Sequence, residues 1–169
     1  MTPLRVALID HGQEASLASD LAASLRERGH DAVVIGGRGT ALDGLLERRG
    51  FATPLTHLPA TVAQLARGGY DIANAFSPPD AYAALYWARR SGRPVVFSCT
   101  HPVERARLAD RRLKLRFLRA ALEDSDAVIV HDEDSRAAAW RWLSLEPPLI
   151  PWRDAAALED LYRRLLAQT

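Results

Sequence analysis

The chain alternates short, continuous apolar runs with longer amphipathic segments along its whole length. The clearest apolar runs are Leu4 to Ile9, Pro94 to Cys99 and Ala127 to Val130. Such runs are typical of strands buried on both faces, because a half-buried strand alternates apolar and polar residues. Amphipathic segments follow the runs, as where Leu17, Leu21 and Leu25 form one stripe. The alternation predicts one Rossmann-like three-layer α/β/α domain with a mostly parallel sheet.

The boundaries of these elements follow from capping residues and breakers. Ser77, two prolines and Asp80 form a helix start with serine at the N-cap, and Gly92 ends that helix. The pattern predicts strands over 4–9, 32–35, 54–58, 70–76, 94–99 and 127–130, and Pro54 places the run 54–58 at an edge. It predicts helices over 16–28, 41–49, 60–67, 77–90, 103–123, 133–143 and 154–167.

Composition narrows the class of protein. A length of 169 residues predicts one domain. The single cysteine, Cys99, excludes an internal disulfide and a cysteine-built zinc site, and we place no other metal site. A net charge of +1 argues neither for nor against a polyanionic partner. The chain shows neither a signal peptide nor an apolar stretch of roughly 18 residues, so we expect a cytoplasmic protein.

A glycine run at 36–40 invites a dinucleotide-binding interpretation. A G-x-G-x-x-G fingerprint lies after the first strand, whereas this run follows the second, and Leu42 stands where the third glycine belongs. We therefore interpret the run as a turn and expect no cofactor. The sequence also lacks a Walker A loop and a G-x-S-x-G nucleophile turn.

Ligands of parallel sheets bind at the carboxyl ends of the strands, so the loops at 10–15, 36–40, 77–80, 100–104 and 131–135 are the candidate site. After the first strand, Gly12 leaves room for backbone N–H groups to approach an anion or a sugar hydroxyl, with His11 and Gln13 beside it. The alternative interpretation of this loop is a plain turn.

Histidines follow two later strands. His101 can orient an acceptor hydroxyl or act as a general base, with Glu104 one turn into the next helix. In the alternative interpretation, His101 caps that helix and Glu104 complements the helix dipole, and the two roles can coexist. His131 ends a later strand, where it can pair with Asp132.

The helix over 103–123 carries many basic residues. An apolar stripe of Leu108, Leu115, Leu118 and Leu122 favours an ordinary core helix. The alternative is peripheral contact with an anionic membrane through Arg105 to Arg119. We expect no nucleic acid partner, because aromatic residues are not interleaved with the basic ones.

Several segments, in order, resemble the family-four (retaining, GT-B) glycosyltransferases, especially small actinobacterial-type members. The opening strand and "LAASLRERGHDAVV" are similar to the start of these enzymes. So are "YDIANAFSPPDAYAAL", with Asn74 where the family often has His, and the long segment 92–143. "LIP" at 149–151 resembles the start of the family's hinge.

The resemblance implies an acceptor-side domain at 1–151 and a C-terminal closing helix at 152–169 that packs back on it. We find no counterpart of the family's nucleotide-sugar domain after Pro151, so we expect little or no activity from the chain alone. The implied ligand is a sugar or glycolipid-type acceptor, and a second copy or a donor-domain partner would complete the reaction. His101 would be catalytic, and the acceptor would be bound by His11, Gly12, Gln13, Ser77, Asp80, Glu104 and His131.

A non-catalytic interpretation stays open beside this one. An α/β scaffold or binding module would show the same alternation of strands and helices, and it would associate with itself through the face that a donor domain normally covers.

Overall fold

The computed structural model describes residues 2–11, 15–36, 57–100, 112–144, 146–151 and 154–169. The strands in these ranges form one five-stranded sheet in the order β2-β1-β3-β4-β5, with every pair parallel. Their bounds are β1 Arg5–Asp10, β2 Asp31–Gly36, β3 Ile72–Ala75, β4 Val95–Cys99 and β5 Ala127–Val130. The predicted α/β fold with a parallel sheet is confirmed.

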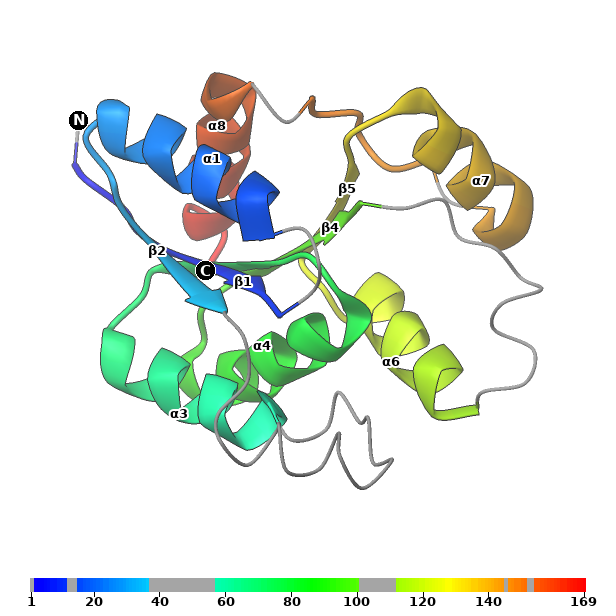
Figure 1. Cartoon of the computed structure of the whole chain (residues 1–169), viewed down its shortest axis with the longest axis horizontal. Coiled ribbons are helices and arrows are strands. Elements are labelled where there is room, and N and C mark those ends of the chain that lie inside the picture. The colour runs from blue at the N-terminus through cyan, green and yellow to red at the C-terminus, as the bar shows by residue number, and fades with distance from the viewer. Residues whose placement is uncertain (1, 12–14, 37–56, 101–111, 145, 152–153) are drawn as a thin grey trace.

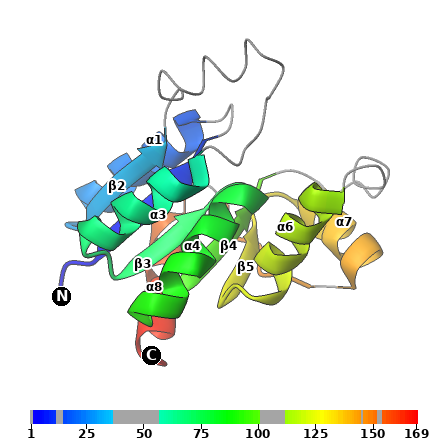
Figure 2. The ribbon, with the colours of Figure 1, turned by 90° about the horizontal axis from the view of Figure 1, so that it is seen from below.

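Helices cover both faces of this sheet. Those in the described ranges are α1 Ala15–Glu27, α3 His57–Gly68, α4 Pro78–Ser91, α6 Arg112–Glu123, α7 Glu133–Leu143 and α8 Ala155–Leu166. Helices α1 and α8 lie on one face and α3, α4 and α6 on the other (Figure 1). Figure 2 shows the second group side by side across its face. Helix α7 packs against β5.

The apolar runs are continuous because each strand contributes to two cores. In β1, Val6 and Leu8 pack toward α1 and α8, whereas Ala7 and Ile9 pack toward α3, α4 and α6. All four side chains are fully buried. A polar residue at any of these positions would be buried whichever face it pointed to, which explains the lack of alternation.

The helix that begins at Ser77 follows the predicted caps. Ser77 is the N-cap of α4, and its hydroxyl accepts a hydrogen bond from the backbone N–H of Asp80. Gly92 ends the helix in the left-handed conformation, with φ 67°, and its N–H donates to the carbonyl of Ala88 over 2.8 Å.

Two details differ from the sequence predictions. His57 and Leu58 begin α3 and are not part of a strand, because Pro59 lies in the first helical turn, where its missing N–H is tolerated. In α6, Leu115 is 48% exposed. Phe117 and Ala121 are buried instead, so the buried face of the helix lies away from Leu115. Residues 54–56, the helix predicted over 41–49 and the first part, 103–111, of the helix predicted over 103–123 lie outside the described ranges.

A buried chain of hydrogen bonds joins α8 to the sheet. The Ser98 hydroxyl donates to Asn74 Oδ1 over 2.7 Å, and Asn74 Nδ2 donates to the Tyr162 hydroxyl over 2.8 Å. Ser98 and Asn74 are on β4 and β3, Tyr162 is on α8, and all three are fully buried. Burial raises the pKa of the Tyr162 hydroxyl, with the hydrogen bond from Asn74 opposing it, so the group stays neutral. The chain fixes how α8 lies on the sheet.

Tyr162→Phe should lower the free energy of unfolding by about 1–3 kcal/mol, because it leaves the buried Asn74 amide without its acceptor. Urea denaturation of the two proteins measures the difference. Tyr86→Phe is the matched control, since its hydroxyl is bonded to Arg90 at the surface, and its unfolding midpoint should not move. Equal midpoints for wild type and Tyr162→Phe would contradict the prediction.

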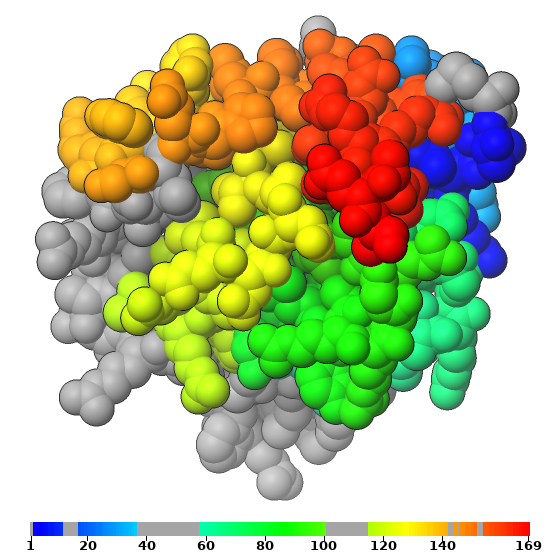
Figure 3. Space-filling view, turned by 180° about the vertical axis from the view of Figure 1, so that it is seen from behind, coloured from blue at the N-terminus to red at the C-terminus, as the bar shows by residue number. Residues whose placement is uncertain are grey.

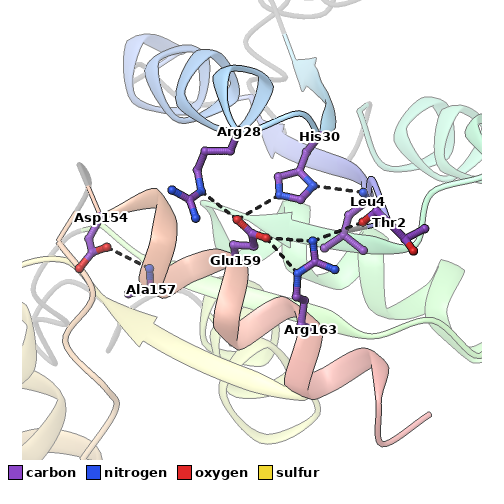
Figure 4. Close-up of polar contacts among 8 residues, drawn as sticks. All are labelled: Thr2, Leu4, Arg28, His30, Asp154, Ala157, Glu159 and Arg163. Carbon is purple, nitrogen blue, oxygen red and sulfur yellow. Dashed lines mark hydrogen bonds and ion pairs between the residues drawn. The ribbon is translucent and has the colours of Figure 1, made fainter.

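A second anchor of α8 is the buried carboxylate of Glu159 (Figure 4). Arg28 Nε donates to its Oε2 over 2.8 Å, and Arg163 Nε donates to its Oε1 over 2.9 Å. Arg163 also donates to the carbonyl of Thr2 over 3.3 Å. Figure 3 shows the resulting arrangement, in which the end of α8 lies beside the first residues of the chain. The carboxylate thus ties α8 to the loop after α1 and to the start of β1.

His30 lies in the same cluster, with one ring nitrogen facing Glu159. The backbone N–H of Leu4 donates to His30 Nδ1 over 3.1 Å, so the ring proton lies on Nε2, which is 3.2 Å from Glu159 Oε2. Burial acts to raise the pKa of the Glu159 carboxyl, but hydrogen bonds from His30, Arg28 and Arg163 outweigh it and lower the pKa to about 2.

Glu159→Gln should destabilise the fold by about 2–3 kcal/mol at neutral pH, because the three donors lose a charged acceptor. The folded-state pKa is lowered, so this stabilisation is complete above the ordinary pKa of 4.5 and is lost as the pH falls toward 2. Urea unfolding of both proteins as a function of pH measures it. The control is Asp160→Asn, an exposed acid-to-amide change on the same helix. A difference between wild type and Glu159→Gln that did not shrink below about pH 4.5 would contradict the prediction.

Candidate functional site

The strand order of the sheet reverses at β1. From β1 the chain crosses to β2 on one side, and the later strands β3, β4 and β5 follow on the other. In such sheets a ligand crevice forms beyond the carboxyl ends of the two strands on either side of the reversal. Here those ends lead to His11 after β1 and to Ser77 after β3.

Three residues of the predicted site meet at this point. His11 Nδ1 lies 2.7 Å from Asp80 Oδ1, and the backbone N–H of His11 donates to Asp80 Oδ2 over 3.2 Å. The Ser77 hydroxyl donates to the same Oδ2 over 2.6 Å. The Asp80 side chain is only 3% exposed. Asp80 accepts hydrogen bonds from these donors and lies in the first turn of α4, where acidic residues are favoured.

Thr61 is a further member of this cluster that the sequence analysis missed. Its hydroxyl oxygen, on α3, lies 3.5 Å from His11 Nε2, and the residue is buried. A single threonine inside an amphipathic helix does not form a recognisable sequence motif. Its place near His11 depends on how α3 packs beside α4, which only the structure reveals.

The end of β2 approaches the same region closely. In the register of the two strands, Gly36 pairs with Asp10, the residue before His11. A Cβ atom at Gly36 would collide with the carbonyl of Asp10. The first glycine of the run that we interpreted as a turn therefore has a steric role. The rest of the run, 37–40, lies outside the described ranges.

Gly36→Ala should displace the end of β1 and lower the free energy of unfolding by about 1–3 kcal/mol, since the added methyl group meets backbone atoms. Amide chemical shifts of Asp10 and His11 and a denaturation curve measure both effects. Gly29→Ala is the control: it adds strain at φ 87° but meets no atom within 4 Å. Unchanged shifts at Asp10 and His11 in Gly36→Ala would contradict the steric argument.

His131 lies apart from this cluster, because β3 and β4 separate β1 from β5. It is buried, and its Nδ1 donates to the carbonyl of Ile150 over 2.6 Å. Burial lowers the pKa of His131 to about 4, against the opposing effects of that hydrogen bond and of Asp132, so the ring is neutral at physiological pH. Asp132 itself caps α7 by accepting from the N–H of Ser135 over 2.7 Å.

The remaining predicted site residues are Gly12, Gln13, His101 and Glu104, and they lie outside the described ranges. The same holds for 105–111 of the basic segment. Their proposed roles therefore stay predictions. In the part of the chain that the structure describes, no group of three or more His, Cys, Asp or Glu side chains is placed to hold a metal ion.

A pocket of about 360 Å³ lies near the amino ends of β1 and β2, beside the Glu159 cluster. Its lining residues are Pro3, Glu27, Arg28, Gly29, His30, Glu159 and Arg163. The charged groups of Arg28, Arg163 and Glu159 are bonded to one another there. We place the candidate site at the strand reversal, where several polar groups converge beyond the carboxyl ends of the strands.

The fold and this cluster define a doubly wound α/β domain with a polar site at its strand reversal. A sequence profile described as Glycosyltransferase Family 4 matches residues 15–151, which is most of the chain, and the chain belongs to this family. The predicted family resemblance is thereby confirmed.

Comparison with solved structures supports the fold. A chain described as sucrose-phosphate synthase from Thermosynechococcus elongatus superposes with a TM-score of 0.68 at 18% identity, covering 95% of this chain and 98% of the other. At that identity the likeness concerns the fold. The search of curated proteins gives no match. Among the helices that the structure describes, none combines the length and the apolar character needed to cross a membrane.

Proposed function

We propose that this domain is the acceptor-side half of a GT-B glycosyltransferase and that its crevice at β1 and β3 binds a sugar or glycolipid-type acceptor. The observation that carries the proposal is the cluster of His11, Ser77 and Asp80 at the strand reversal of a family-four domain. Hydroxyl, carboxylate and imidazole groups are the side chains that hydrogen-bond sugar hydroxyls.

The proposal assigns further roles to residues of the neighbouring loops. Gly12 and Gln13 follow β1 in the sequence, Glu104 follows β4, and His131 follows β5. We propose that all four bind the acceptor and that His101 is the catalytic group. The proposed location is the cytoplasm, where the single, buried Cys99 stays reduced.

We further propose that residues 1–151 are the acceptor domain and that 152–169 are its closing helix. The support is the docking of α8 through Tyr162 and Glu159.

Glycosyl transfer also needs groups that stabilise the phosphates of the leaving nucleotide. We propose that a donor-binding domain, on a second copy or on a partner protein, supplies them. The chain by itself should then bind acceptor sugars but turn over nucleotide sugars weakly or not at all.

Binding of acceptor sugars tests this function. Titration of the ¹⁵N-labelled chain with glucose, mannose and N-acetylglucosamine should shift the amide signals of His11, Ser77 and Asp80, because a sugar bound in the crevice would change the surroundings of these amides. His11→Ala should abolish the shifts. Signals that move only near Glu159, or in no part of the protein, would overturn the proposed site.

The control is Arg119→Ala, a surface change in an exposed ion pair with Glu123. It should leave the titration unchanged. Incubation with uridine and guanosine diphosphate sugars completes the test, since rapid turnover by the monomeric chain would contradict the need for a donor domain.

A further inference from the structure

The carboxylate of Asp80 holds His11 at two points. One oxygen faces the ring at Nδ1, 2.7 Å away, and the other accepts the backbone N–H of the same residue over 3.2 Å. The two contacts fix both the position of the backbone after β1 and the rotation of the imidazole. Asp80 is itself held by Ser77 and by the start of α4.

The contacts also determine where the ring carries its proton. An ionised carboxylate only accepts hydrogen bonds, so Nδ1 must be the protonated nitrogen. In the neutral ring, Nε2 is then an acceptor. The Thr61 hydroxyl oxygen lies 3.5 Å from Nε2, a long contact that a bound sugar hydroxyl would replace. The His11 side chain is 15% exposed, so the ring is partly accessible from solvent.

We propose that Asp80 is a positioning residue that keeps His11 in the Nδ1-protonated form, so that Nε2 accepts a hydrogen bond from a sugar hydroxyl bound in the crevice. This inference rests on the proposed function and specifies one contact in it. A hydroxyl that donates its hydrogen to Nε2 keeps its oxygen lone pairs free to face the donor sugar. With the proton on Nε2 instead, the sugar hydroxyl would have to accept the hydrogen bond from Nε2. One lone pair of its oxygen would then be occupied by the histidine.

The tautomer of His11 is measured directly by ¹⁵N NMR of the imidazole. A neutral ring shows one protonated and one unprotonated nitrogen, so the pH is raised until His11 gives this pattern. We expect Nδ1 to give the protonated signal and Nε2 the unprotonated one. The opposite assignment in the wild-type chain would overturn the proposal without any mutant.

Asp80→Asn should exchange the two signals. The Oδ2 position accepts from the His11 backbone N–H, which can only donate, so the amide oxygen of asparagine must stay there. The amide nitrogen then faces Nδ1, which must become the acceptor, and the proton moves to Nε2. A folded Asp80→Asn protein that retains the wild-type tautomer would show that Asp80 does not set it.

Asp154→Asn is the matched control, because Asp154 also starts a helix and accepts a backbone N–H, that of Ala157. It should leave the His11 signals unchanged, and a change there would show that the readout reports general destabilisation. The sugar titration separates the two proposals. A sugar should move the Nε2 signal of the wild type; if the tautomer is as expected but no sugar moves this signal, the positioning by Asp80 stands and the proposed function fails.

Discussion

Strand β1 pairs in parallel with β2 along one edge and with β3 along the other, and the positions of His11, Ser77 and Asp80 in the candidate site follow from this double pairing. Because the backbone of β1 is bonded on both sides, its end cannot shift without disturbing two neighbours. The loop after β3 is brought beside the loop after β1, which is how Asp80 reaches His11 across 69 positions of sequence. At the end of β2, Gly36 lies close to the carbonyl of Asp10, so β2 also limits where the end of β1 can lie.

Buried polar groups then determine how the helices are placed on the sheet. An apolar face alone lets a helix slide or rotate at low cost, whereas a buried amide or carboxylate must find its partners. Helix α8 carries two such requirements, met by Asn74 at Tyr162 and by Arg28 and His30 at Glu159. These contacts lie at separate points along the helix, so they fix its direction as well as its depth.

The sequence predicted the fold well because its local signals agree with one another. Strands buried on both faces are continuous apolar runs, and Ser77 and Gly92 mark helix ends through their own backbone chemistry. The two errors arose where a local signal was weak: Pro59 is compatible with a first helical turn, and Leu115 has the spacing of a core residue without its burial.

The site was predicted in part. Residues at the ends of parallel strands could be placed at one edge, so the nearness of His11, Ser77 and Asp80 follows from topology. The contacts of Thr61 and Glu159 could not be predicted, because each joins helices whose relative rotation depends on the whole core. Asn74 did give a signal, since an amide inside a fully buried strand requires a buried partner.

The closeness of Pro151 and Asp154 has a consequence for the architecture of larger proteins built on this domain. The backbone N–H of Asp154 donates to the carbonyl of Pro151 over 2.9 Å, so the chain leaves the sheet and starts α8 at nearly the same place. A separately folded unit whose own ends are close together could be inserted between these two residues, and neither α8 nor the sheet would have to move. Gain or loss of a whole domain at this point would then be a single genetic event, with the anchors of the helix unchanged on either side of it.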